Sequence, residues 1–155
     1  GEILIALKEL DYKILNIITW RKTNPMPNIT KRILTHSTEF IIWAAKSKGW
    51  TFNYEDMKKY SDGKQLRDVW EFPLCQGKER IKNDTGRAAH PNQKPMALIS
   101  RIVEMASEQG DLVLDPFLGA GTTAVAAKLL HRTWIGIENN SDYIKIAKTR
   151  ISKEN

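Results

Sequence analysis

The N-terminal part of the chain repeats apolar residues first at helical and then at strand spacing. Residues 2–10 place apolar side chains on one side of a helix, which predicts an amphipathic helix there. Residues 12–20 and 39–45 are rich in β-branched and aromatic residues, and both runs predict buried strands. A loop is expected between them, because the prolines within 23–28 remove backbone donors and favour extended backbone.

The middle of the chain lacks the regular apolar spacing of the first part. Residues 46–89 are polar and basic and have no sustained period. Within them, 54–60 favours a short helix and 68–72 favours a short strand. The sequence therefore predicts a largely irregular region between two more regular ones.

A clear alternation of helix and strand fills the rest of the chain. Helical spacing predicts helices over 95–107, with Pro95 in the first turn, and over 122–130, and a third helix with Ser141 as its N-cap. Short apolar runs predict strands over 111–117 and 133–137. This alternation is typical of a parallel sheet flanked by helices, so the expected fold class is α/β.

Composition and charge narrow the class of protein. The chain has 155 residues, 41% of them hydrophobic and 27% charged, which is typical of a globular domain with a modest core. No apolar run has the roughly 18 residues of a membrane helix. The first residues lack the pattern of a signal peptide, so a cytoplasmic protein is expected. The net charge of +6 favours an anionic partner, although an ordinary basic surface explains it equally well.

The few cysteine and histidine residues argue against two kinds of site. Cys75 is the only cysteine, so no internal disulfide is expected. It also has no obvious activating base nearby in sequence, so a small, partly buried thiol is its expected role. His36, His90 and His131 are too dispersed to predict a metal site, and none is expected.

A glycine-containing turn follows the strand predicted over 111–117. Gly119, Gly121 and Ala124 fit the pattern G-x-G-x-x-A, and Glu138 ends the next predicted strand. The glycines allow a tight turn and the close approach of a ligand, and the glutamate can accept hydrogen bonds from ribose hydroxyls. The pattern therefore predicts a site for an adenosine-containing cofactor.

Asp115 helps to decide which cofactor this is. Its carboxylate lies at the carboxyl end of a predicted strand, where it would repel the pyrophosphate of a nicotinamide dinucleotide. The same carboxylate suits the cationic ammonium and sulfonium groups of S-adenosylmethionine (SAM). SAM is therefore the expected cofactor. A nicotinamide-dependent oxidoreductase and a plain strand-to-helix turn capped by Asp115 are the alternatives.

Two longer motifs carry a family resemblance. The sequences HPNQKP at 90–95 and DPFLGAGTT at 115–123, separated by a predicted helix, closely resemble the beta class of bacterial DNA amino-methyltransferases. The resemblance implies a Rossmann-like SAM-dependent methyltransferase fold, in which the first motif folds over the methionine part of the cofactor. It implies that SAM is surrounded by His90, Gln93, Lys94, Pro95, Asp115, Pro116, Phe117, Gly119, Gly121, Thr122, Thr123 and Glu138.

The N-terminal half resembles the same class. NPMPN at 24–28, followed by HSTE at 36–39, is similar to the segment that helps to receive a flipped target base. Residues 68–82 are similar to enzymes that methylate adenine in GANTC, and parts of 12–70 are similar to enzymes that act on GATC. The side chains expected around a flipped base are Trp20, Asn24, Pro25, His36, Glu39 and Phe40, with core packing as the alternative for Trp20.

Double-stranded DNA is the expected macromolecular partner. An amino group inside a duplex cannot be reached, so the enzyme has to hold the DNA while the base leaves the stack. A solvated surface charge is the alternative for each basic residue. The candidates for contact with phosphates or base edges are Lys22, Asn28, Lys31, Arg32, Lys78, Arg80, Lys82 and Arg87.

The catalytic motif of the family, as in Asp-Pro-Pro-Tyr, is absent. The only Asp-Pro is Asp115-Pro116, at the start of the glycine-containing turn 115–121 (called the cofactor turn below), so no catalytic residue is expected in this chain. The resemblance places the motif, together with the central strands of the sheet, N-terminal to these residues. The sheet is therefore expected to be incomplete, with two pairs of strands that each present an unpaired inner edge. A longer protein or a partner chain is expected to complete it, and a homodimer is among the assemblies this allows.

These patterns predict three regions with one function. Residues 1–45 correspond to the C-terminal part of the catalytic subdomain, 46–89 to target recognition and 90–155 to SAM binding. The expected reaction is methyl transfer from SAM to the exocyclic amino group of a flipped adenine within GANTC, with this chain inactive by itself. N4-cytosine methylation and a non-catalytic module that binds SAM or DNA are the alternatives.

Overall fold

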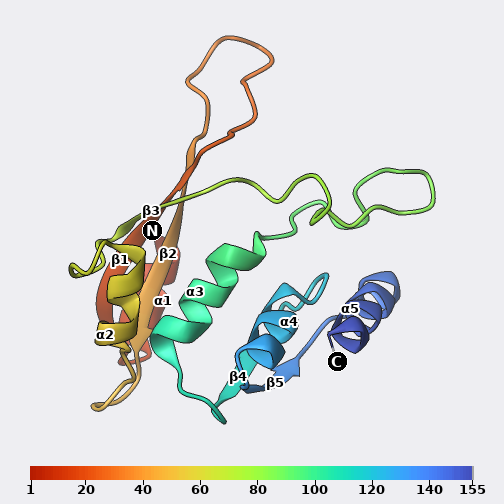
Figure 1. Ribbon diagram of the computed structural model, residues 1–155. Helices are drawn as coiled ribbons and strands as arrows, with labels where there is room; N and C mark the ends of the chain where they lie inside the picture. The colour runs from red at the N-terminus through yellow and green to blue at the C-terminus, as the bar shows by residue number, and fades with distance from the viewer. Residues whose placement is uncertain (155) are drawn as a thin grey trace. The chain divides into compact units, whose positions relative to one another are not determined.

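The computed structural model divides the chain into two compact units, Gly1–Leu74 and Cys75–Asn155, and residues 1–154 are described. Each unit has its own sheet (Figure 1). The boundary between the units falls inside the region 46–89 that the sequence assigns to target recognition. The structure therefore has two compact units, and the three functional regions inferred from the sequence stay a prediction.

The first unit is built around a three-stranded sheet of order β2-β1-β3. Strands β1 and β2 pair antiparallel, and β3 pairs parallel with the second half of β1, from Thr19↔Val69 to Lys22↔Phe72. Its elements are α1 (Glu2–Glu9), β1 (Lys13–Lys22), β2 (Thr38–Ala45), α2 (Tyr54–Met57), the 3-10 helix η1 (Lys58–Tyr60) and β3 (Val69–Phe72). All of these elements were predicted from the sequence and are confirmed.

The pairing of β3 corrects one expectation about this sheet. The sequence predicted a pair of strands whose inner edge is open, but β3 covers the end of β1 from Thr19 onward. The pairing also buries aromatic side chains, since Trp20 and Trp70 are adjacent partners that are 1% and 2% exposed. The edge of β1 that the prediction left open is therefore paired with β3 from Thr19 to Lys22.

The second unit alternates helices and strands as predicted. Strands β4 and β5 pair parallel, from Leu112↔Thr133 to Asp115↔Gly136. Helix α4 packs on both strands and also contacts α3 and α5. The elements are α3 (Met96–Ala106), β4 (Leu112–Asp115), α4 (Thr122–Leu129), β5 (Thr133–Gly136) and α5 (Ser141–Lys153). The fold class is α/β, as the sequence indicated.

Small residues bring α4 close to its neighbours. Ala126 and Ala127 are fully buried in the middle of this helix, and Gly121 precedes its first turn. A Cβ atom at Gly121 would lie 2.9 Å from the Cβ of Ala147 in α5, closer than real carbon atoms approach. The second glycine of the turn therefore serves the packing of two helices, in addition to its φ of +81°.

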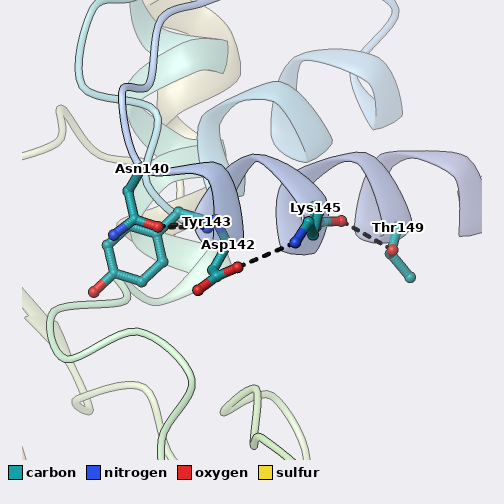
Figure 2. Close-up of polar contacts among 5 residues, drawn as sticks. All are labelled: Asn140, Asp142, Tyr143, Lys145 and Thr149. Atoms are coloured by element: carbon teal, nitrogen blue, oxygen red, sulfur yellow. Dashed lines mark hydrogen bonds and ion pairs between the residues drawn. The ribbon is translucent and has the colours of Figure 1, made fainter.

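The first residues of two helices differ from the prediction. Asn140, not Ser141, is the N-cap of α5, because its backbone is extended and its side-chain oxygen accepts hydrogen bonds from the N–H groups of Asp142 and Tyr143 (Figure 2). Pro95 is the N-cap of α3 and has extended backbone, so it lies just before the first turn and not within it.

One face of the β4–β5 pair carries exposed apolar side chains. Leu112, Leu114 and Ile135 are 60%, 58% and 49% exposed, although parallel sheets are normally covered on both faces. The sheet is incomplete in this sense, as predicted. Within residues 1–154, no helix is long and apolar enough to cross a membrane.

Candidate cofactor pocket and DNA-contacting residues

A pocket of about 210 Å³ lies in the second unit, around the turn that joins β4 to α4. It brings together the two motifs that carry the family resemblance, which are separated in sequence by helix α3. Its lining consists of His90, Asn92, Gln93, Lys94, Ile99, Asp115, Phe117, Leu118, Gly119, Ala120, Thr122 and Thr123. Most of the residues predicted to surround SAM are therefore found on one pocket.

The turn after β4 contains hydrogen bonds of its own. Asp115 ends the strand, and its Oδ1 accepts a hydrogen bond from the N–H of Phe117 at 3.0 Å. The N–H of Gly121 donates to the carbonyl of Leu118 at 3.0 Å. These bonds hold the loop in one conformation and keep the Asp115 carboxylate at the pocket.

His90 packs directly on this turn. A Cβ atom at Gly119 would lie 2.8 Å from Nε2 of His90, so only glycine leaves room for the imidazole. The ring also stacks obliquely on Tyr143 at a centroid distance of 4.4 Å. Burial lowers the pKa of His90, opposed by the nearby Glu138 carboxylate. Because Nδ1 accepts a hydrogen bond from the N–H of Asn92, the neutral ring carries its proton on Nε2.

Glu138, two residues after the end of β5, holds the turn through hydrogen bonds from three backbone N–H groups. Its Oε2 accepts from the N–H of Gly119 at 2.8 Å, and its Oε1 accepts from the N–H groups of Asn139 and Asn140, each at 2.9 Å. These bonds lower the pKa of the Glu138 carboxyl, chiefly through Asn140. A carboxylate oxygen has further lone pairs, so the predicted hydrogen bonds to ribose hydroxyls are compatible with this arrangement.

Gln93 has a use that sequence reasoning did not foresee. It is 6% exposed, its Oε1 accepts from the N–H of Ile81 at 3.0 Å and its Nε2 donates to the carbonyl of Glu79 at 2.8 Å. The Glu79 carboxylate in turn accepts from the N–H of Met96 at the start of α3. Gln93 therefore lines the pocket while its amide fixes the backbone of 79–81, which is a structural role beside the predicted contact with SAM.

Four predicted cofactor residues lie outside the pocket lining. They are Pro95, Pro116, Gly121 and Glu138. Conversely, the lining contains four residues that were not predicted, and all of them belong to the same motifs or to the apolar repeat of α3. These are Asn92, Ile99, Leu118 and Ala120.

Arg150 in α5 contacts the turn and was not predicted either. Its Nη1 donates to the carbonyl of Ala120 at 2.7 Å and to the hydroxyl of Thr122 at 3.1 Å. Burial lowers the pKa of this guanidinium, opposed by its neighbours Cys75 and Glu79. Cys75 itself is buried, as its expected packing role requires, and burial raises the pKa of its thiol.

The residues predicted around a flipped base lie in the first unit and differ in accessibility. Trp20 is 1% exposed and its indole N–H donates to the carbonyl of Phe72 at 2.9 Å, which favours core packing, the alternative role. The side chain of Asn24 accepts from the N–H of Leu74 at 2.6 Å. Pro25 is half-buried, whereas His36 and Phe40 are exposed. Glu39 is half-buried and forms an ion pair with Lys22 at 3.0 Å.

The residues predicted to contact DNA lie mostly on exposed connections. Lys31 and Arg32 are exposed in the long connection between β1 and β2, which extends beyond the ends of the two strands in Figure 1. Asn28, in the same connection, accepts from the Thr30 hydroxyl at 2.7 Å. Lys22 is paired with Glu39, so it is less accessible than the others.

In the second unit, an isolated bridge between Lys82 and Ala88 closes a small hairpin that carries Arg87, and both basic side chains are exposed. The side chain of Asn83 shapes its turn by accepting from the N–H groups of Thr85 and Arg87. Lys78 is also exposed. Arg80 is half-buried and donates to the carbonyl of Pro91 at 2.8 Å, which ties it to the protein itself.

Comparison with known proteins decides the family. The profile of the family described as DNA methylase matches residues 2–149. The chain belongs to this DNA methylase family. Two curated relatives are each 46% identical to the chain. The Type II methyltransferase M2.LlaDCHI of Lactococcus lactis subsp. cremoris matches over 96% of this chain and 55% of the relative. The Type II methyltransferase M2.DpnII of Streptococcus pneumoniae matches over 97% of this chain and 56% of the relative.

A solved structure shares the fold over almost the whole of this chain. The crystal structure of the M1.HpyAVI–SAM complex has a TM-score of 0.79 and 37% identity, over 97% of this chain and 68% of that chain. The Rossmann-like methyltransferase fold predicted from the sequence is thereby confirmed. The chain spans about half the length of the curated DNA methylases it matches.

Proposed function

We propose that this chain is the cofactor-binding and target-recognition part of a site-specific DNA adenine methyltransferase. The observation that carries the proposal is the pocket at the end of β4, which unites the Asp115 turn with the 90–95 motif. Adenine within GANTC is the proposed target, on the strength of the resemblance over 68–82. The proposed location is the cytoplasm, where a bacterial cell holds its DNA.

The residues of the pocket fit SAM. Asp115 offers a carboxylate to the cationic methionine part, Gly119 leaves the backbone free of a side chain, and Glu138 lies beside the turn to accept from a ribose. SAM supplies an electrophilic methyl group on its sulfonium when bound. The residues of this chain would bind and orient the cofactor and the flipped base, so their contribution to the rate is positioning and electrostatics.

The relatives support the same reaction class. Two are named Type II methyltransferases, and the structurally similar M1.HpyAVI was crystallised as a complex with SAM. Because the chain spans 55% and 56% of the two curated relatives, the activity of a complete enzyme, its DNA substrate and a segment or partner chain that supplies the catalytic motif are all part of the proposal.

Calorimetric titration with SAM tests the pocket. We expect the chain to bind SAM and Asp115→Ala to abolish binding, because the carboxylate that balances the cationic groups is lost. Asp84→Ala, an exposed carboxylate at the tip of the 82–88 hairpin, is the matched control and should bind as before. Unchanged binding by Asp115→Ala would remove the proposed pocket, and a melting temperature raised by NADH but not by SAM would restore the oxidoreductase alternative.

The second candidate function is a non-catalytic module that binds SAM or DNA, a function that does not need the Asp-Pro-Pro-Tyr motif that these residues lack. Both candidates predict that this chain alone transfers no tritiated methyl group to GANTC duplexes. Transfer above background would reveal a catalytic residue among these 155. If the longer gene product methylates DNA, the modified base separates adenine from N4-cytosine transfer, whereas inactivity of that product supports the module.

A further inference from the structure

Arg150 lies outside both family motifs yet touches the centre of the cofactor turn. We propose that Arg150 is a positioning residue that turns the Thr122 hydroxyl into a hydrogen-bond donor for the carboxylate of the cofactor's methionine part. This inference rests on the proposed function, because it takes SAM as the ligand of the pocket.

The guanidinium reaches the turn from α5. One nitrogen, Nη1, donates both to the carbonyl of Ala120 at 2.7 Å and to Oγ1 of Thr122 at 3.1 Å. The peptide that follows Ala120 is also fixed at its other end, since the N–H of Gly121 donates to Leu118. Arg150 therefore binds both the Ala120 carbonyl of the turn and the Thr122 hydroxyl.

The hydrogen bond from Arg150 restricts the direction in which the Thr122 hydroxyl can donate. A threonine hydroxyl has one proton and two lone pairs, and the guanidinium, which is always charged and only donates, occupies a lone pair. The hydroxyl proton is repelled by the same cation, so it turns away from Arg150. Thr122 is 7% exposed and lines the pocket. A ligand in the pocket is therefore the acceptor available to the Thr122 hydroxyl.

The chemistry of that acceptor follows from charge. A hydroxyl that already accepts from a cation is a stronger donor, and donors of this kind favour an anionic acceptor. Of the groups of SAM, only the methionine carboxylate is anionic, whereas the ammonium and sulfonium suit Asp115. Arg150 and Asp115 would thus select the two opposite charges of one amino-acid group from two sides of the turn.

The test compares SAM with decarboxylated SAM, which keeps the sulfonium, the amine and the adenosine. We expect the unaltered chain to prefer SAM by about tenfold in calorimetry, the order expected for a hydrogen bond to a charged group. Thr122→Val and Arg150→Met should each lose most of this preference, whereas Thr122→Ser and Arg150→Lys should retain part of it. The double variant should lose no more preference than Thr122→Val alone, because both residues act through one hydroxyl.

Matched controls separate this role from a structural one. Lys148→Met removes an exposed cation from the same helix and should leave the preference unchanged. If Arg150 only stabilises the fold, Arg150→Met weakens both cofactors equally, and this result overturns the inference. If Arg150→Met fails to fold, the pair Thr122→Val and Thr122→Ser decides, and an unchanged preference in Thr122→Val overturns it. No SAM binding by the unaltered chain would instead remove the proposed function.

Discussion

Only glycine meets the two structural requirements at position 119. Its φ of +54° is in the left-handed region, and His90 occupies the space where a side chain would begin. At the same residue the backbone N–H donates to Glu138. The fit between turn and imidazole is therefore set by the absence of a single carbon atom.

We expect Gly119→Ala to lower both stability and affinity for SAM. The left-handed backbone costs about 1–2 kcal/mol for alanine, and the new Cβ also displaces His90. Gly86→Ala is the control, because its φ is +76° but nothing lies within 4 Å of the added carbon. Thermal unfolding and calorimetry measure both effects. Equal losses in the two variants would mean that the contact with His90 contributes nothing.

Glu138 predicts a pH dependence of stability. Its pKa is lowered in the folded chain by the N–H groups of Asn140, Gly119 and Asn139, so the carboxylate stabilises the fold above the ordinary value of 4.5. This contribution is lost as pH falls through the lowered pKa. The difference in melting temperature between the unaltered chain and Glu138→Gln should therefore be largest at pH 7 and shrink below pH 4.5.

Thermal unfolding of both proteins between pH 3 and pH 7 measures it. Glu9→Gln, which alters an exposed carboxylate at the end of α1, is the control and should give a small difference at every pH. A difference for Glu138→Gln that grows toward low pH would contradict the assigned hydrogen bonds.

At the scale of elements, helix α5 supports both the cofactor turn and the His90 ring that packs on it. Asn140 fixes its first turn, Tyr143 supports the ring of His90 and Arg150 holds the Ala120 carbonyl. Figure 2 shows the side chain of Asn140 folded back over the start of the helix, close to Asp142 and Tyr143. Residues near both ends of α5 therefore contact the cofactor turn or the His90 ring that packs on it.

Replacing the cap should destabilise the chain, whereas replacing its neighbour should not. Asn140→Ala leaves the N–H groups of Asp142 and Tyr143 without their acceptor and should cost about 1 kcal/mol. Ser141→Ala should change the free energy of unfolding by only about a few tenths of a kcal/mol, because Ser141 is the first residue of the helix. Urea unfolding of the two variants compares them, and a larger loss in Ser141→Ala would restore the sequence-based cap.

For the whole molecule, charge is the property that bears on a DNA partner. The net charge is +6, and exposed basic side chains occur on both units, in the connection between β1 and β2 and around the 82–88 hairpin. Arg80 and Lys22 are engaged with the protein itself, so Arg87, Lys82, Lys31 and Arg32 are the better candidates for contact with phosphates.

Binding of the chain to a GANTC duplex should weaken as salt rises, because cations released from the DNA favour the complex. Arg87→Ala should weaken binding and reduce the slope of log affinity against log salt by about 1. Fluorescence anisotropy from about 50 to 200 mM salt measures both. Lys145→Ala removes an exposed cation that pairs with Asp142, and its slope should be unchanged. An equal change in both variants would show that only net charge matters.

The sequence by itself determined the helices, the strands and the two motifs of the pocket. These features are local: helical or strand spacing needs only near neighbours, and the turn with Asp115, Gly119 and Gly121 lies within one short segment. The same local patterns were sufficient for the family resemblance, which the comparisons confirm.

Only the tertiary structure decided what several side chains do. Gln93 bonds to 79–81, Arg150 bonds to the cofactor turn and Trp20 is covered when β3 pairs with β1. Each of these contacts joins residues that are far apart in the chain, and no spacing along a sequence encodes such a meeting. The motifs could therefore be found from the sequence, whereas the residues that hold them in place could be found only after the chain had folded.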